Sequence, residues 1–437
     1  MIKKFYRCGS YKKSRRTNSP YTIPRITENI IDHKLSNGAR VLLKEQQGVD
    51  TSIVLAFPYG LANDLHRSHL IEHIIFRSCK GVGRGYVVDR AIEKLGGYYT
   101  GYTTEDCMGL VTKFLARNSR KGLELIFNSL TDYRIDPEVL KKEKIIVHGE
   151  LQERKSDPEF ILDEGQNSAL FKGHPIYAGK ETKKGYNEVT VEELEKIKKL
   201  HFGAKNLFIG ISGPNIQKLL DDVEEIIGNL PSVGTDIHKF GSQKIERQER
   251  NYKEYGVKDN VISIAFPTCG FDNRDTYALD IMTNCLTGSC EEYDTRNRLW
   301  FNLREKRGII YHTRLEHIAG LGIGHVDIRS FGTVKKNTET VKRIMIEELE
   351  RFITEEIPEE EFIAARDSYL LSTYRKNRLN DVEEIAEELA LSGIYGADLT
   401  YNENARKIMS LTPRDIKRVA RKYLGEGGIS IATLTGK

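Results

Sequence analysis

Two histidines and a glutamate lie close together in the segment 69–73, which reads His-Leu-Ile-Glu-His. In a helix, His69 and His73 lie one turn apart on the same side, the spacing that lets two imidazoles hold a single zinc ion. Glu72 falls on that side too, where its carboxylate can act as a general base without being a ligand. The pattern predicts a zinc-dependent hydrolytic site. The purely structural alternative is a pair of surface histidines with a solvated glutamate between them.

A catalytic zinc needs a third protein ligand, and two acids are candidates. Asp136 followed by Pro137 predicts the start of a helix. Within that helix Glu143 and Glu150 are seven residues apart, so they share a face. Either acid could complete the site, while the other orients an imidazole. Alone, each would be read as a surface carboxylate.

A helix must carry the His-Leu-Ile-Glu-His segment. A strand predicted over 52–57 ends before Pro58, and Asn63 or Asp64 can cap a helix running to about Cys79. Strand and helix signals alternate along the rest of the chain, so we predict an α+β fold. The further helices are predicted over 86–95, 119–130, 137–155 and 191–201.

The two halves of the sequence resemble each other. Ala-Phe-Pro occurs at 56–58 and again at 265–267, an offset of 209. Thr-Val-Glu-Glu-Leu at 190–194 and Thr-Pro-Arg-Asp-Ile at 412–416 both precede a helix and a strand, at an offset of 222. The difference of 13 is an ordinary amount of loop insertion. We therefore expect two related domains, each a sheet covered by helices, over 28–228 and 250–437, with a linker over 229–249.

Composition excludes several classes of protein. The 437 residues include 67 Lys and Arg against 63 Asp and Glu, a formal net charge of +4, which argues against a nucleic-acid partner. At 39% hydrophobic and 30% charged residues the chain is typical of a soluble globular protein. No stretch approaches the roughly 18 apolar residues of a spanning helix, so we expect no membrane insertion. The six cysteines form no CxxC pair, and we expect them to be reduced.

Residues 1–27 contain eight Lys and Arg and no Asp or Glu. We interpret this segment as a basic, solvated N-terminal tail outside the fold. It has no apolar block of a secretory signal, which favours the cytoplasm. Transit peptides share this basic composition, so an organellar matrix is the alternative compartment.

The metal motif and the acid pair resemble the inverted-zincin metallopeptidases of the pitrilysin type (M16). The resemblance covers most of 30–437 and is nearest to the half-size members, namely mitochondrial processing peptidase subunits and prokaryotic peptidases. It implies one zinc ion per chain, held by His69, His73 and a glutamate 77 residues after the second histidine, which is Glu150. It also implies Glu72 as the base and a role in the site for Glu143. The implied activity is endopeptidase cleavage of short or unfolded polypeptides.

A second segment also resembles the family. Leu-Arg-Glu-Lys-Arg-Gly-Ile-Ile-Tyr at 303–311 has the family's Arg and Tyr seven residues apart, at Arg304 and Tyr311. The resemblance implies that both act on substrate, since a phenol or guanidinium can donate to the oxygen that becomes negative during amide hydrolysis. Read alone, a tyrosine after Gly-Ile-Ile would be a core residue of a strand.

The second half lacks the metal motif. Adding 209 to the motif positions gives Ala278, Ile281 and Met282, so that half would serve as scaffold and substrate wall. The resemblance implies that each chain forms half of a clamshell and pairs with a second copy or with a homologous chain. Two departures from the family pattern are His66, where a glycine is common, and Thr100, where an asparagine is common. For His66 a hydrogen-bonding role is favoured over that of an extra ligand.

Two other functions are compatible with parts of this pattern. The family includes non-catalytic subunits, and some chains act only with a partner. Such members usually lose the metal motif, whereas this chain keeps it. A metal-binding regulatory protein is the third reading, and it would have no need of Glu72.

Overall fold

The computed structural model describes residues 29–132, 134–254, 256–288, 297–379, 381–397 and 401–436. The predicted tail, Cys8 and Cys290 lie outside the described residues. Among the described residues, no helix has the length and apolar character needed to span a membrane. The other four cysteines are buried free thiols, at Cys79, Cys107, Cys269 and Cys285.

The first half of the chain forms a six-stranded sheet, called sheet 1 below. Its strand order is β1-β2-β8-β3-β7-β6, with β2 parallel to β8 and the other neighbours antiparallel. The strands are β1 (Ile30–Lys34), β2 (Arg40–Glu45), β3 (Asp50–Phe57), β6 (Tyr98–Thr103), β7 (Met108–Leu115) and β8 (Phe208–Gly213). The helical elements are α1 (Leu65–Ile74), α2 (Tyr86–Glu93), η1 (Ala116–Asn118), α3 (Ser119–Thr131), α4 (Pro137–Ser156), α5 (Phe160–Phe171), α6 (Lys183–Glu188), α7 (Val191–His201), η2 (Ala204–Asn206) and α8 (Ile216–Ile227).

The second half forms a five-stranded sheet, called sheet 2. Its order is β11-β12-β10-β13-β9, with β13 parallel to β9. The strands are β9 (Gln248–Glu254), β10 (Asn260–Cys269), β11 (His312–Ala319), β12 (Ile323–Thr333) and β13 (Ser430–Gly436). The helical elements are α9 (Asp275–Thr287), η3 (Trp300–Glu305), η4 (Lys335–Asn337), α10 (Thr338–Thr354), α11 (Glu359–Leu379), α12 (Val382–Tyr395), α13 (Tyr401–Met409), α14 (Pro413–Ala420) and η5 (Arg421–Gly425).

The two sheets have the same topology. The order β6-β7-β3-β8-β2 in sheet 1 corresponds to β11-β12-β10-β13-β9 in sheet 2, with the parallel pair at the same place. The helices α4, α5 and α7 begin at 137, 160 and 191, and adding 222 gives 359, 382 and 413, where α11, α12 and α14 begin. The predicted α+β fold, with two related mixed sheets covered by helices, is confirmed.

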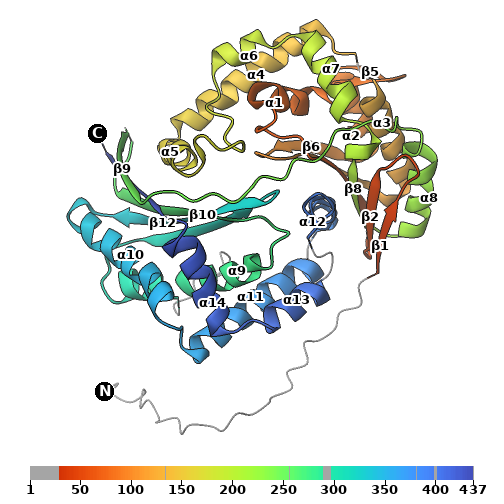
Figure 1. Cartoon of the computed structure of the whole chain (residues 1–437). Coiled ribbons are helices and arrows are strands. Elements are labelled where there is room, and N and C mark those ends of the chain that lie inside the picture. The colour runs from red at the N-terminus through yellow and green to blue at the C-terminus, as the bar shows by residue number, and fades with distance from the viewer. Residues whose placement is uncertain are drawn as a thin grey trace, which may run out of the picture.

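Each half also covers the sheet of the other half with one helix. α12 packs on sheet 1, where a Cβ added to Gly210 of β8 would lie only 2.8 Å from Ala390 N. α5 packs on sheet 2, where Gln166 Nε2 donates a 2.6 Å hydrogen bond to Ser263 Oγ. Figure 1 shows α5 and α12 between the two sheets. The two halves are therefore interlocked.

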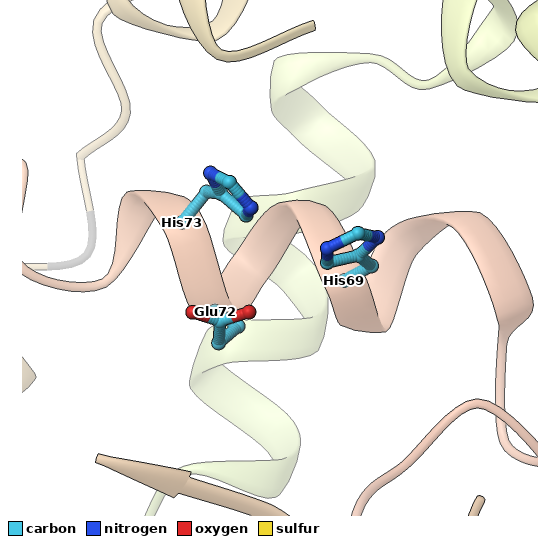
Figure 2. A group of neighbouring side chains, drawn as sticks. All are labelled: His69, Glu72 and His73. Carbon is cyan, nitrogen blue, oxygen red and sulfur yellow. The ribbon is translucent and has the colours of Figure 1, made fainter. Parts of the chain in front are cut away.

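Helix α1 carries the two histidines and Glu72 (Figure 2). It begins as predicted after Asp64, whose carboxylate accepts a 3.2 Å hydrogen bond from Arg67 N. The predicted end near Cys79 is wrong, because α1 ends at Ile74. The chain then forms a small hairpin, β4 (Ser78–Cys79) with β5 (Gly83–Arg84), in which glycines with positive φ at 81 and 83 turn the backbone. The other four predicted helices match α2, α3, α4 and α7 within two residues.

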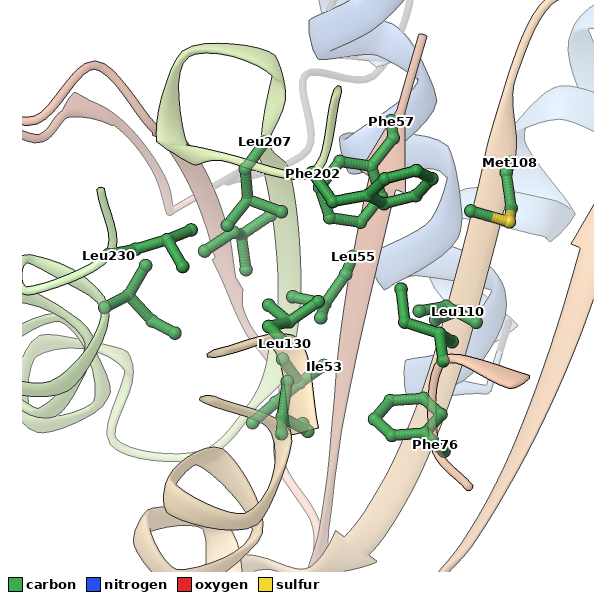
Figure 3. Close-up of a cluster of buried hydrophobic side chains, with 14 of the residues drawn as sticks. Ile53, Leu55, Phe57, Phe76, Met108, Leu110, Leu130, Phe202, Leu207 and Leu230 are labelled. Carbon is green, nitrogen blue, oxygen red and sulfur yellow. The ribbon is translucent and has the colours of Figure 1, made fainter. Parts of the chain in front are cut away.

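The core of the first half fixes the orientation of α1. Figure 3 shows part of this core, in which the rings of Phe57 on β3 and Phe202 pack with their centroids 4.7 Å apart. Leu70, Ile71 and Ile74 of α1 join the same buried cluster. Burying each such side chain stabilises the fold by roughly 1.5–3 kcal/mol. The apolar side of α1 is thus held against sheet 1, and its histidine side faces α4.

Candidate metal centre

The two histidines project from the same side of α1 (Figure 2). Their ring centroids are 5.0 Å apart. One ligand atom from each of His69, Glu72 and His73 can be chosen so that all three lie within 4.8 Å of one another. Both imidazoles are largely buried, with side chains 15% and 14% exposed. Side chains held this close, with little solvent between them, form a potential metal site.

Glu150 of α4 lies across from both imidazoles. Its Oε2 is 3.5 Å from His69 Nε2 and 3.3 Å from His73 Nε2. With bonds of about 2.0–2.1 Å, two ligands of a tetrahedral zinc are roughly 3.3 Å apart, so these separations suit a shared ion. The Glu150 side chain is 41% exposed, which leaves one side of the site open to solvent. Two imidazole nitrogens and one carboxylate oxygen thus fit the donor set of a catalytic zinc.

Glu143, also on α4, occupies a different position. Its side chain is 6% exposed, and its Oε2 lies 3.3 Å from His73 Nδ1, on the far side of the ring from Nε2. Arg77 Nε forms an ion pair with its other oxygen at 3.0 Å. Arg77 in turn donates a 2.6 Å hydrogen bond to Asp89, which also accepts one from Tyr99 of β6. Glu143 Oε2 thus faces Nδ1 of His73, whereas the carboxylate oxygen that faces both Nε2 atoms belongs to Glu150.

Two residues that the sequence did not single out contact His69. Its Nδ1 lies 3.1 Å from Glu181 Oε1 and 2.8 Å from the Tyr186 hydroxyl. Tyr186 donates a hydrogen bond to Glu181, and Arg154 forms an ion pair with the second carboxylate oxygen. Burial alone would raise the pKa of Glu181, but hydrogen bonds from His69 and Tyr186 and the Arg154 charge lower it to about 2. The one sequence signal was a tyrosine in a polar stretch, and Tyr186 is fully buried.

Glu72 points toward strand β6. A Cβ added to Gly101 of β6 would lie 2.8 Å from Glu72 Cδ, so the glycine makes room for this carboxylate. Burial raises the pKa of the Glu72 carboxyl, although the charges of His73 and His69 oppose the rise. A carboxylate that is poorly solvated and close to the metal donors is suited to accept a proton from a water molecule.

The structure does not bring Arg304 and Tyr311 to this cluster. They lie in η3 and just before β11, where Arg304 donates to the Tyr311 carbonyl and stacks on Trp300 at 4.2 Å. Tyr311 is 61% exposed. Among the described residues, no hydrogen bond or ion pair connects either one to His69, Glu72 or His73.

The structure also shows the surroundings of His66, which precedes the motif on α1. His66 is not directed at the metal donors, because its Nε2 accepts a 3.1 Å hydrogen bond from Thr182 N. Burial lowers the pKa of His66, which favours this neutral, accepting ring.

In the second half, the positions that correspond to the motif are fully buried apolar residues, namely Ala278, Ile281 and Met282.

Family models match both halves of the chain. Residues 40–179 match the model described as Insulinase (Peptidase family M16), and residues 188–369 match the one described as Peptidase M16 inactive domain. The chain belongs to the M16 peptidase family. The predicted resemblance is confirmed, and the M16 model described as inactive covers the positions that lack the metal motif.

Individual relatives of this M16 chain are distant. An uncharacterized zinc protease of Bacillus subtilis (strain 168), YmxG, is 22% identical over 64% of this chain and 68% of its own length. A probable mitochondrial-processing peptidase subunit beta of Arabidopsis thaliana is 21% identical over 84% of this chain and 70% of its own. The crystal structure of a protease from Helicobacter pylori has a TM-score of 0.81 at 17% identity, covering 94% of this chain and 100% of that one. This structural likeness shows the fold alone.

Proposed function

We propose that this M16 chain is a zinc-dependent endopeptidase that hydrolyses peptide bonds of short or unfolded polypeptides. One observation carries the proposal: Glu150 Oε2 lies within 3.5 Å of both His69 Nε2 and His73 Nε2, with Glu72 beside them on the same helix. His69, His73 and Glu150 would hold one zinc ion. Zinc in such a site supplies Lewis acidity toward water and the scissile carbonyl.

Glu72 would carry the proton transfers. Its carboxylate accepts a proton from the attacking water and passes it to the leaving amine, so that the same group serves both steps. Burial of Glu72, which raises the pKa of its carboxyl, brings its basicity closer to that needed near neutral pH. Gly101 lets the carboxylate occupy this place beside β6.

Strand β6 offers a place for an extended substrate. It is an edge strand of sheet 1, with β7 on one side and no strand on the other within the described part of the chain. An extended peptide can add to such an edge through main-chain hydrogen bonds. Because these bonds do not use the side chain of Thr100, the departure there from the family pattern is compatible with substrate binding.

A second chain is part of the proposal. Arg304 and Tyr311 have no contact with the metal cluster of their own chain among the described residues. This separation supports an arrangement in which they act on a site in a second copy or in a homologous partner chain. The alternative function, a subunit that cleaves only with its partner, is favoured by the same separation. A wholly non-catalytic role gains no support, because the three proposed zinc ligands lie close together with Glu72 beside them.

Purified protein tests this function. We expect one zinc per chain, a mass of two chains by light scattering, and cleavage of a quenched unstructured peptide. Glu72→Gln should keep the zinc and lose about 10²–10⁴-fold in kcat, whereas His73→Ala should lose both. Zinc binding without cleavage by the isolated chain would favour the partner-requiring subunit. Wild-type protein without zinc, or undiminished cleavage by Glu72→Gln, would refute the proposal.

A further inference from the structure

A short segment crosses the first turns of α1 and touches two of its histidines. Residues 181–186 run into α6 and are called the clasp below. Glu181 and Tyr186, at the two ends of the clasp, both lie against His69 Nδ1. Between them, Thr182 N donates to His66 Nε2 at 3.1 Å. The clasp thus holds α1 through polar contacts to His66 and His69, and on His69 it contacts the ring nitrogen that does not face Glu150.

The hydrogen bonds of the clasp specify which nitrogen of His69 carries the proton. The ionised Glu181 carboxylate can only accept hydrogen bonds, and the Tyr186 hydroxyl donates its single proton to Glu181. Both groups therefore present lone pairs to His69 Nδ1, and a lone pair on Nδ1 would be repelled by them. The arrangement requires a proton on Nδ1. In the neutral ring the lone pair then lies on Nε2, which faces the Glu150 carboxylate across the place where one metal ion could bind both.

The other imidazole is held in the same way by different elements. His73 Nδ1 faces the Glu143 carboxylate of α4, and Arg77 neutralises that carboxylate as Arg154 neutralises Glu181. Each imidazole thus has a carboxylate behind it and an arginine behind the carboxylate. The carboxylate for His73 comes from a long helix, whereas the carboxylate for His69 comes from the clasp.

The position of the clasp depends on one close contact. A Cβ added to Gly185 would lie 2.6 Å from His66 Nδ1 and nearer still to other atoms of that ring. The His66 ring also packs edge-on against Tyr186, with centroids 4.8 Å apart. His66 thus pairs with a glycine of the clasp. Any side chain at 185 would force the His66 ring or the clasp to move, which would disturb the contact between the clasp and α1.

We propose that the clasp is a positioning element of the metal centre, which fixes the tautomer and orientation of His69 through Glu181 and Tyr186. The inference rests on the proposed zinc site, but its central step concerns the metal-free protein. It assigns positioning roles to two residues outside the metal motif. It also gives the His66–Gly185 contact a function, namely to set the distance between the clasp and α1.

The first test separates this inference from the proposed function. In the metal-free protein, long-range ¹⁵N–¹H spectra of labelled histidine, recorded at a pH at which the His69 ring is neutral, should report His69 as the Nδ1–H tautomer. In the Glu181→Gln/Tyr186→Phe double variant the Nε2–H tautomer should gain population. The zinc dissociation constant, measured by competition with a fluorescent chelator, should rise about 10–100-fold in each single variant.

Several outcomes would overturn the inference. Wild-type His69 in the Nε2–H form would refute it whether or not zinc binds, whereas absent zinc with the Nδ1–H form would refute only the proposed function. A merely structural clasp would lower the melting temperature of the metal-free variants and leave the His69 tautomer and zinc affinity unchanged. That result would also contradict the inference.

A second test leaves Glu181 and Tyr186 in place. Gly185→Ala should weaken zinc binding by at least about tenfold, and adding His66→Ala should restore most of the affinity because the obstructing ring is gone. Gly149→Ala is the matched control, since an added Cβ there meets nothing within 4 Å. Unchanged affinity in Gly185→Ala, or no recovery in the His66→Ala/Gly185→Ala double variant, would show that this contact does not set the position of the clasp.

Discussion

Replacing Gly101 with alanine should displace the proposed base without touching any proposed metal ligand. The new Cβ would lie 2.8 Å from Glu72 Cδ, whereas non-bonded carbons settle at about 3.5–4.0 Å. The carboxylate must therefore retreat by roughly 0.7 Å or more. Gly101 has no positive φ, so alanine adds no backbone strain at this position. The substitution thus isolates the placement of Glu72.

A misplacement of about 1 Å can cost an enzyme on the order of 100-fold in rate. For a shift of roughly 0.7 Å we expect kcat to fall about 30- to 100-fold, equivalent to about 2–3 kcal/mol in the barrier. The zinc content should stay at the wild-type value. Both quantities can be measured on one preparation, by cleavage of a quenched peptide and by metal analysis.

The matched control is again Gly149→Ala, because it adds the same methyl group to α4 in open space. It should retain wild-type turnover. If Gly101→Ala cleaves as fast as the wild type while binding the same amount of zinc, the rate does not depend on the position that Glu72 has beside Gly101. The argument that Gly101 positions the base would then be wrong.

Three further predictions concern stability. Asp106 accepts hydrogen bonds from Leu321 N at 2.6 Å and from the Tyr395 hydroxyl at 3.1 Å, so Asp106→Ala should lower the free energy of unfolding by about 2–4 kcal/mol; an unchanged urea midpoint would contradict this. Gly210→Ala should cost about 1–3 kcal/mol by forcing α12 from sheet 1, and a wild-type melting curve would argue that the helix shifts freely. Burial lowers the pKa of Lys198 to about 8, below its ordinary 10.5, so the unfolded chain binds more protons between these values. Stability should therefore rise from pH 8 to 10.5, and Lys198→Met should remove that rise; a variant that keeps the full rise would exclude Lys198 as its source.

The sequence predicted the parts of the site that lie within single helices. Spacing along one helix placed His69, Glu72 and His73 on one side, and it paired Glu143 with Glu150 on one face. Spacing could not decide which of the two acids faces the Nε2 atoms of His69 and His73. Seven residues span about 10.5 Å of helix, so only one of the acids can be level with these atoms. Which one it is depends on where α4 crosses α1. That crossing depends on packing across the whole first half.

Other features depend on contacts between distant segments. Glu181 is 112 residues from His69 in sequence, and no periodic pattern links a loop residue to a helix so far away. The exchange of α5 and α12 between the halves was also missed. The one sequence feature that reflects this exchange is the unbroken apolar run on β3. Val54 and Ala56 face α12, whereas Ile53 and Leu55 face the core of the first half. A run of this kind indicates a strand buried on both faces but does not identify what covers the second face.

The absence of the metal motif from the second half agrees with the way its helix is packed. Ten of the thirteen residues of α9 are buried, against four of the ten in α1. Imidazoles at the positions of Ala278 and Met282 would be buried in a hydrophobic cluster, at a cost of about 1–3 kcal/mol for each unpaired polar group. In α1 the two imidazoles instead have carboxylate oxygens within 3.5 Å of both ring nitrogens. The first half thus has a polar helix face that carries the candidate metal site, whereas in the second half the corresponding face is part of the core, and α12 of that half packs on sheet 1.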